Sequence, residues 1–212
     1  IIFTTVRSTI DVDMAQKATS RSVGRPREFD EEAALEAAMD AFWAKGYEAT
    51  SMADLCSCTG LHKGSLYQAF GDKHTLFMDS LNHYAETEFR EVAAVAYDSD
   101  SPLENIRAMV FKIAADSKSE KGCMMVNTMV ELAPHDPEIR KALEAIATNR
   151  TRFMVDMIAK AQAAGEIRPE LSPEKLALQL MVTLAGSAAL VKGFMEGEPL
   201  LENLQDLMNS WV

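Results

Sequence analysis

Helix start and stop signals recur along the chain, and alternation of apolar and polar residues never lasts long enough for a strand. Two starts combine a capping side chain with a proline suited to the first helical position, at Asp136-Pro137 and Ser172-Pro173. Apolar residues then recur at steps of three and four, which is the spacing of one helix face. Gly165 follows the first of these stretches and is suited to end it. The sequence therefore predicts an all-α fold.

The expected helices cover most of the chain from residue 30 onward. We expect them at about 30–46, 51–58, 62–70, 72–95, 103–117, 123–133, 136–164, 172–191 and 200–211. The chain has 212 residues, of which 48% are hydrophobic, so it can bury a sizeable core and is not wholly disordered.

Several features bear on the compartment. Three cysteines are too few for a disulfide framework in a chain of this size, which favours a reducing environment. The longest apolar run, Leu180 to Val191, is too short to span a bilayer. The N-terminus lacks the order of a signal peptide, and Met14 opens a more ordinary start, so we expect residues 1–13 to be upstream or misassigned sequence. A cytoplasmic protein with no membrane partner is expected.

The net charge of −11 argues at first against nucleic acid as a partner, because phosphate repels an acidic surface. The charge is uneven, however: residues 1–75 carry 8 basic and 11 acidic side chains, and residues 76–212 carry 13 and 21. The charged residues between Asp13 and Glu28 are all basic, namely Lys17, Arg21, Arg25 and Arg27. This stretch predicts either a basic arm or a solvated disordered tail.

Two short helices joined by Thr59-Gly60 have the arrangement of a helix-turn-helix, whose second helix enters the major groove of DNA. Four apolar residues are expected to form the small core that fixes the crossing: Phe42, Leu55, Leu66 and Phe70. The other face of the second helix presents groups that reach base edges and phosphates, namely His62, Lys63, Ser65, Tyr67 and Gln68. Gly64 lets the backbone approach DNA closely. Alternatively, Tyr67 and Gln68 merely cover the core.

A series of short motifs runs through this region: Gly46-Tyr47, Thr50-Ser51, Gly60-Leu61, Lys63-Gly64-Ser65-Leu66-Tyr67, Phe70, Asp72-Lys73 and Leu76-Phe77. Through these motifs, residues 24–77 closely resemble the TetR family of bacterial one-component transcription regulators. The resemblance implies a three-helix DNA-binding domain with a helix-turn-helix, followed by a larger helical domain for effector binding and dimerisation. It also implies a homodimer that binds a near-palindromic double-stranded operator and usually represses.

The resemblance also implies domain boundaries and contact residues. We expect a flexible N-terminal arm at 1–23, a DNA-binding domain at 24–73 and an effector-binding and dimerisation domain at 74–212. His62 is less typical of the family and is expected to set part of the base preference. The predicted DNA contacts, to bases or phosphates, are Arg25, Arg27, Thr50, Ser51, His62, Lys63, Gly64, Ser65, Tyr67, Gln68 and Lys73.

The body of the chain carries no cysteine–histidine cluster, phosphate-binding glycine loop or Ser-x-Gly elbow, so we expect no metal, no cofactor and no enzymatic activity. A pocket for a small-molecule effector of unknown identity is expected among its helices. The predicted effector-binding residues are Met109, Ile113, Cys123, Val126, Asn127, Val130, Phe153, Met157, Leu184 and Lys192. Arg150 interrupts an apolar stripe and is read either as binding an acidic effector or as reaching to the rim.

Cys123 follows Gly122 at a predicted helix start, where the helix dipole can lower the pKa of a thiol. The segment 122–134 resembles a branch of the family in which a Gly-Cys pair opens the sixth helix. That branch includes sensors of electrophiles or oxidants, in which a lysine matched here by Lys192 lies near the thiol. The other reading is a small buried hydrophobic residue. Both readings stay open at the level of sequence.

The last two helices are expected to form the dimer interface. Small residues let helices approach closely, and leucines offer a second apolar seam. The predicted interface residues are Ala185, Ala188, Leu200, Leu204, Leu207 and Trp211. Two alternative functions remain at this level: a helix-turn-helix DNA-binding protein or activator that needs no ligand, and a helical enzyme or carrier.

Overall fold

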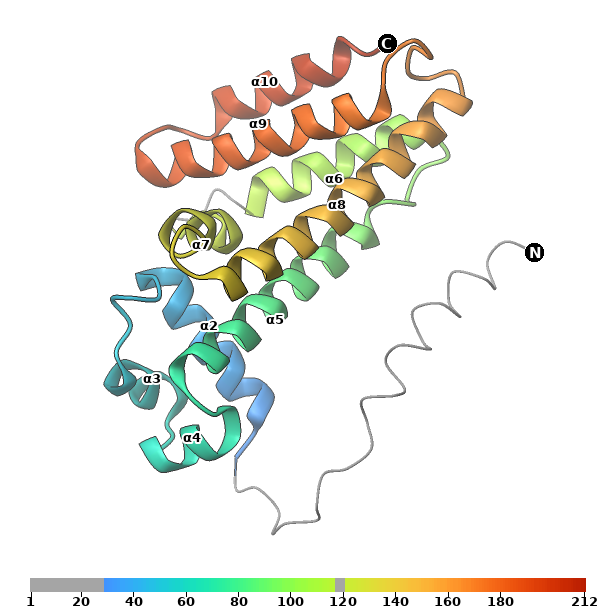
Figure 1. Ribbon diagram of the computed structural model, residues 1–212. Coiled ribbons are helices and arrows are strands. Elements are labelled where there is room, and N and C mark those ends of the chain that lie inside the picture. Colours follow the sequence, from blue (N-terminus) through green and yellow to red (C-terminus); the bar gives the residue numbers. More distant parts are fainter. Residues whose placement is uncertain (1–28, 117–120) are drawn as a thin grey trace, which may run out of the picture. The chain divides into compact units, whose positions relative to one another are not determined.

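The computed structural model describes residues 29–116 and 121–212 (Figure 1). These residues are helical, and they contain no strand. The helices, in chain order, are α2 (Glu31–Lys45), α3 (Met52–Thr59), α4 (Lys63–Phe70), α5 (Lys73–Ala94), α6 (Pro102–Asp116), α7 (Met124–Glu131), α8 (Pro137–Ala163), α9 (Pro173–Gly193) and α10 (Glu198–Asn209). They confirm the all-α fold, and each helix begins and ends within two residues of the stretch expected from sequence.

Local capping explains where several helices begin. The Ser51 hydroxyl accepts a hydrogen bond from the backbone N–H of Asp54, whose carboxylate accepts one from the backbone N–H of Ser51, so α3 starts with a complete capping box. Asp72, Asp136 and Ser172 cap α5, α8 and α9 through their side chains. These are the caps that the sequence predicts.

The first buried cluster joins α2, α3, α4 and α5. Phe42, Leu55, Leu66 and Phe77 are buried in it, and Phe70 packs against it. Three of these four buried residues, together with Phe70, are the core expected for the helix-turn-helix. The cluster also takes in α7 and the first turn of α8, through residues far along the chain: Met124, Leu132 and Ile139. The helix-turn-helix is therefore anchored on α7.

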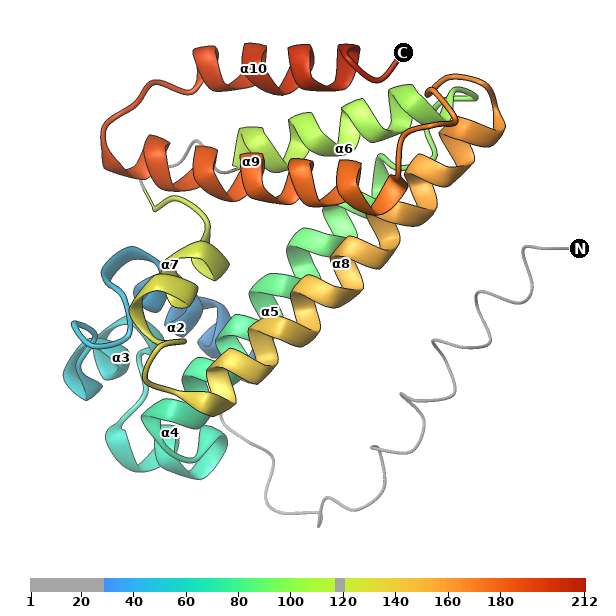
Figure 2. The ribbon, with the colours of Figure 1, turned by 45° about the horizontal axis from the view of Figure 1, so that its top comes forward.

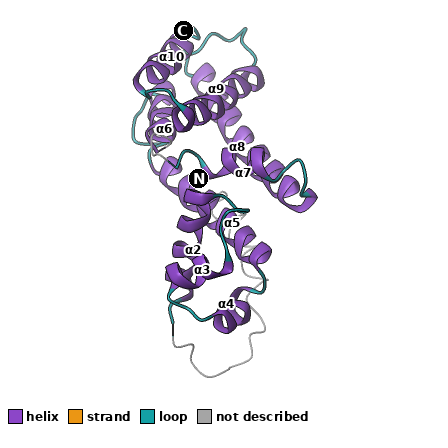
Figure 3. Ribbon diagram, turned by 90° about the vertical axis from the view of Figure 1, so that its left-hand side faces the viewer, coloured by secondary structure: helices purple, strands orange, loops and turns teal. Residues whose placement is uncertain are grey.

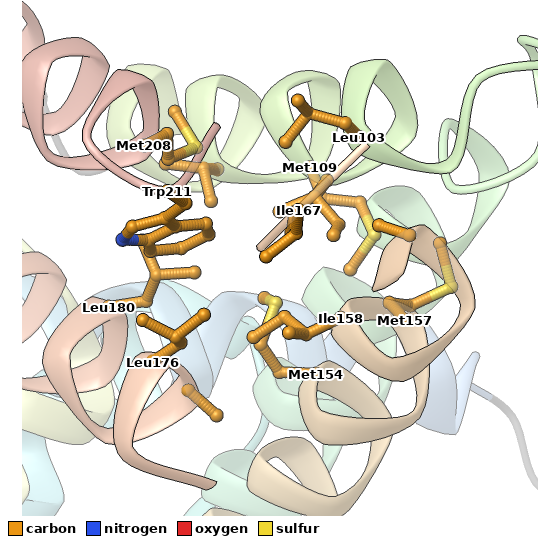
Figure 4. Close-up of a cluster of buried hydrophobic side chains, with 14 of the residues drawn as sticks. Leu103, Met109, Met154, Met157, Ile158, Ile167, Leu176, Leu180, Met208 and Trp211 are labelled. Atoms are coloured by element: carbon orange, nitrogen blue, oxygen red, sulfur yellow. The ribbon is translucent and has the colours of Figure 1, made fainter. Parts of the chain in front are cut away.

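The second buried cluster joins α6, α8, α9 and α10 with the end of α5. Trp211, which follows α10, lies beside Met208 and above Leu180 in Figure 4. The side chains of Trp211 and Leu204 are 1% and 0% exposed. The last helix is therefore part of the core of its own chain.

The described helices place the two clusters toward opposite ends of the bundle. In Figures 1 and 2, α3 and α4 lie at one end, and α9 and α10 at the other. Figure 3 shows α2, α3 and α4 grouped together. The long helices α5 and α8 connect the ends, and they contact each other through Phe89 and Phe153, whose ring centroids are 5.3 Å apart.

Candidate DNA-binding surface and ligand cavity

The outer face of α4 is polar and open. His62, Lys63, Tyr67 and Gln68 are exposed, and Ser65 is half-buried. A Cβ built on Gly64 meets no atom within 4 Å, so the backbone there can be approached closely. His62 stands in the N-cap position of α4 without a side-chain cap, which leaves its imidazole free for other contacts. Donors and acceptors are thus gathered on one side of a short helix.

Two lysines next to this face lie against aromatic rings. The Lys63 ammonium is 5.7 Å from the centroid of the Tyr67 ring, and that of Lys73 is 4.2 Å from the centroid of the Tyr47 ring. A cation–π contact restrains a long side chain without removing its charge. Both ammonium groups therefore stay available as positive charges close to α4.

The structure changes the reading of Thr50 and Ser51. Thr50 is 0% exposed, and its hydroxyl donates to the carbonyl oxygen of Gly46 at 2.6 Å, so its side chain cannot reach phosphate. It fixes the turn after α2 instead. Ser51 is exposed, but its hydroxyl is occupied by the capping box with Asp54. Arg25 and Arg27, and the proposed arm at 1–23, lie outside the described residues.

A clamp that the sequence did not reveal joins α7 to the turn after α2. The Glu131 carboxylate accepts hydrogen bonds from the backbone N–H groups of Tyr47 and Glu48, at 3.1 and 2.9 Å. The backbone of Gly46 has a φ of +83°, and a Cβ built on it would lie 2.9 Å from Oε2 of Glu131. The two oxygens of Glu131 therefore satisfy two backbone donors in the turn that follows α2.

Two further contacts strengthen this junction. The indole N–H of Trp43 donates to the Gly122 carbonyl oxygen at 3.0 Å, and His74 Nε2 lies 2.8 Å from the Asp136 carboxylate. The partners are 79 and 62 residues apart in sequence, which is why no local pattern predicts them. The segment 122–136 thus contacts α2 at its first end, through Gly122, and α5 at its second end, through Asp136.

A cavity of about 170 Å³ lies among α5, α6, α7, α8 and α9. Six of the ten predicted effector residues line it: Met109, Ile113, Cys123, Val126, Phe153 and Leu184. The other four do not. Val130 faces solvent, and Met157 is buried in the core. Asn127 donates to the Lys121 carbonyl oxygen at 2.8 Å, and Lys192 is exposed, with its aliphatic chain against Gly122.

One ion pair stands in the apolar wall of this cavity. Arg150 donates to the Glu88 carboxylate at 2.9 Å and to the Ala85 carbonyl oxygen at 3.1 Å. The side chains of Arg150 and Glu88 are only 15% and 10% exposed. Arg150 therefore neither reaches to the rim nor stands free for an acidic ligand, because it is already paired with a carboxylate.

Cys123 does not have the expected environment of an activated thiol. Burial raises its pKa, and the Glu88 carboxylate raises it further, which outweighs the lowering by backbone N–H groups at the start of α7. The Tyr84 hydroxyl lies 3.8 Å from the sulfur, and burial and the neighbouring Cys123 and Glu88 raise the pKa of Tyr84 as well. Of the two readings that the sequence leaves open, the raised pKa favours the small buried hydrophobic residue, because burial outweighs the helix dipole at this site.

The residues expected at the dimer interface divide into two groups. Ala188, Leu204 and Trp211 are buried within the chain itself, so they offer no side-chain surface to a partner. Ala185, Leu200 and Leu207 are half-buried. The large apolar side chains that α9 and its C-terminal end expose are others: Leu178, Val182 and Phe194. Within residues 29–116 and 121–212, no three His, Cys, Asp or Glu side chains gather as metal ligands would.

An open polar helix in a helix-turn-helix is the arrangement of a DNA-binding protein, and this one also carries a separate cavity of ligand size. Two family models match the chain: residues 34–79 match bacterial regulatory proteins of the tetR family, and residues 101–210 match the tetracyclin repressor-like C-terminal domain. The chain therefore belongs to the TetR family. Its members are transcription regulators rather than enzymes, and this chain is a DNA-binding regulator.

The curated relatives and the solved structures that resemble this chain are also transcription regulators. The HTH-type transcriptional repressor ComR of Escherichia coli (strain K12) is 30% identical over 199 residues, which are 92% of this chain and 95% of that protein. BdcR, another HTH-type transcriptional repressor of that strain, is 38% identical over 128 residues, 60% of this chain and 64% of that protein. A cysteine mutant of the regulator CifR, solved with 26-base-pair operator DNA, superposes with a TM-score of 0.79 at 30% identity and covers 89% of this chain and 100% of that one.

Proposed function

We propose that the chain is a cytoplasmic repressor that binds a near-palindromic operator as a homodimer and is released by a small molecule in its cavity. The observation that carries the ligand response is the double role of α7. Met125, Val126 and Met129 of this helix line the cavity, and Glu131 at its end holds the turn after α2. One short helix is therefore in contact with both the ligand site and the DNA-binding unit.

Release follows from linkage between the two sites. A ligand that fits the cavity better when α7 is displaced shifts the position of Glu131, and with it the turn that precedes α3. In a dimer this changes the spacing of the two α4 helices against the two half-sites. Because the coupling is reciprocal, operator DNA must lower the affinity for the ligand by the same factor.

The DNA contacts that we propose are those of the open face of α4 and its surroundings. His62, Gln68 and Ser65 reach toward base edges, and Gly64 lets the backbone approach. Lys63, Tyr67 and Lys73 contact phosphate, joined by the arm residues Arg25 and Arg27. In a dimer these basic groups are doubled, so an acidic body with a net charge of −11 does not prevent binding.

The homodimer is proposed to form on the exposed side of α9. Leu178 and Val182 are spaced by one helical turn and are 60% and 64% exposed, and Phe194 directly follows the helix. By length and composition α9 is also apolar enough to cross a membrane. Leu176, Leu180 and Leu184, however, pack in the core, so its opposite side is already covered within the chain. The exposed apolar side of α9 is therefore suited to pack against the same helix of a second copy of the chain.

The test is selection of bound duplexes from a random DNA pool by the purified full-length chain. We expect an enriched inverted repeat whose half-sites are about one helical turn apart or a multiple of it. Selection with Lys63→Ala should give little enrichment, and Lys141→Ala, an exposed lysine on α8, should select the same repeat as the wild type. No enriched sequence with the wild-type protein would contradict the proposal.

A further inference from the structure

We propose that the cavity selects uncharged, apolar molecules about the size of one aromatic ring, and that it discriminates against anions and cations of that size. This inference rests on the proposed function, because it names the class of ligand for the effector cavity. Three observations support it: the size of the cavity, its apolar lining, and the way in which its charges are already paired.

The size of the cavity sets the size of the ligand. Its volume is about 170 Å³. A cavity of ~150 Å³ lined by leucine, isoleucine and phenylalanine in another protein binds benzene. The lining is of the same kind, with Phe89, Phe153 and Leu184 among aliphatic and methionine side chains. Methionine chains adapt to the outline of a ligand, so rings with small substituents fit as well.

The two charged side chains of the wall are paired with each other, so the wall carries no net charge. Among the described residues that line the cavity, Glu88, Arg150 and Cys123 are those with ionisable side chains. Glu88 and Arg150 pair with each other at 2.9 Å, and Arg150 also donates to the carbonyl oxygen of Ala85. Cys123 is buried beside the Tyr84 hydroxyl and remains a neutral thiol. The wall is therefore apolar with one self-compensated ion pair.

An ion entering this cavity loses hydration that the wall does not replace. The pair is neutral as it stands, so a carboxylate that joins Arg150 shares one cation with the Glu88 carboxylate and brings a second buried anion beside it. An ammonium that joins Glu88 likewise brings a second buried cation beside Arg150. A neutral ring adds no charge to the pair, and its burial is favourable in proportion to its apolar area.

The experiment uses three probes of similar shape: toluene, benzoate and benzylammonium. Binding to the full-length protein is measured by isothermal titration calorimetry near neutral pH, without DNA. We expect toluene to bind at least about tenfold more tightly than either ion, because a buried unpaired charge is strongly unfavourable. Equal or tighter binding of benzoate would overturn the inference.

A matched pair of variants on α7 assigns the binding to this cavity. Val126→Phe fills the cavity, because Val126 lines it, whereas Val130→Phe adds the same ring to a side chain that is 71% exposed. Toluene binding should fall at least about tenfold in V126F and stay unchanged in V130F. Retention of full toluene affinity in folded V126F would overturn the assignment.

Two further variants test the role of the ion pair with opposite signs. Glu88→Gln leaves Arg150 without a counter-charge and should raise the affinity for benzoate about tenfold relative to toluene. Arg150→Gln leaves Glu88 unpaired and should do the same for benzylammonium. Thermal unfolding shows whether each variant is folded. If one of the two variants does not fold, the other is sufficient to test the role of the ion pair. The same preference for toluene in a folded variant would contradict the role of the pair.

Operator release is measured separately, so the two proposals fail in different ways. If toluene binds as expected but does not lower operator affinity, the ligand class holds and the proposed function fails. If benzoate instead binds in the cavity and releases operator, the proposed function holds and the ligand class is wrong.

Discussion

The carboxylate of Glu131 on α7 accepts a hydrogen bond from the backbone N–H of Tyr47 at 3.1 Å, across 84 positions of sequence. Its second oxygen accepts the N–H of Glu48 at 2.9 Å. A helix that lines the cavity thereby supplies the hydrogen-bond acceptor for two backbone N–H groups in the turn that precedes α3. This relationship gives the cavity and the helix-turn-helix a shared structural element.

Glu131→Ala should destabilise the fold by about 1 kcal/mol, because it removes the acceptor of a part-buried and an exposed backbone N–H group, which water can then partly satisfy. Glu131→Gln keeps one acceptor oxygen and should fall between the alanine variant and the wild type. Urea unfolding measures the change, with Glu144→Ala, an exposed glutamate on α8, as the control. A stability of Glu131→Ala equal to that of the control would show that the clamp contributes nothing.

Lys63→Ala should weaken operator binding and also reduce its dependence on salt. If Lys63 contacts one phosphate in each half-site, the slope of log K against log salt falls by about 2 for the dimer. Fluorescence anisotropy titrations at several salt concentrations measure this slope. An unchanged slope would remove Lys63 from the phosphate contacts.

Thr50→Val separates a structural role from a DNA contact. The Thr50 hydroxyl donates to the Gly46 carbonyl oxygen, and the side chain is fully buried. The variant should lose about 1 kcal/mol of stability, the net contribution of a typical hydrogen bond, and keep the wild-type affinity for operator DNA at a fixed salt concentration. A lower operator affinity with unchanged stability would restore Thr50 as a phosphate contact.

Cys123 should react slowly with iodoacetamide near neutral pH. Burial and the Glu88 carboxylate raise its thiol pKa, so little thiolate is present, and access is limited as well. Cys58 is exposed and should be labelled first, although its own pKa is also raised by desolvation. Mass spectrometry of the labelled protein gives the order. Labelling of Cys123 ahead of Cys58 would instead indicate an activated thiol.

Acid should remove a stabilising contribution at Asp54. Its pKa is lowered from the ordinary 3.8, first by the hydrogen bond from Lys45 and then by those from Ser51. Because the folded-state pKa lies below the unfolded one, the unfolded state binds more protons in acid. The contribution is complete above about pH 5 and is lost as the pH falls through the folded-state pKa.

Asp54→Asn removes this titration. Its free energy of unfolding should lie below that of the wild type at neutral pH, and the two curves should approach each other as the pH falls through about 4 to 2. Urea unfolding at a series of pH values measures both curves. A constant difference between them across this range would contradict the assignment.

The sequence predicts features that depend on neighbouring residues and misses those that depend on distant ones. Asp72, Asp136 and Ser172 cap helices within three residues, so the helix starts they predict are confirmed. The burial of Trp211 depends on how α10 folds back onto α6 and α9, which periodicity does not specify. The spacing of apolar residues in α10 therefore predicts a contact with a partner chain, although Leu204 packs in the core of its own chain.

The candidate sites follow the same division. The exposed face of α4 is predicted well, because a short helix with a buried Leu66 leaves one side for solvent. The cavity is predicted in part. The pairing of Glu88 with Arg150 and the hydrogen bonds of Glu131 join segments far apart in the sequence, and no local motif predicts either contact. The sequence leaves both readings of Cys123 open for the same reason, because the burial of its thiol comes from contacts across the bundle.

The most direct test of the central claim is a titration of two duplexes of equal length at one salt concentration. One carries the inverted repeat selected from the random pool, and the other carries the same bases in scrambled order. We predict a dissociation constant about 10³-fold lower for the repeat, with two chains bound per duplex. Equal dissociation constants for the two duplexes would contradict the account of the protein as a sequence-specific regulator.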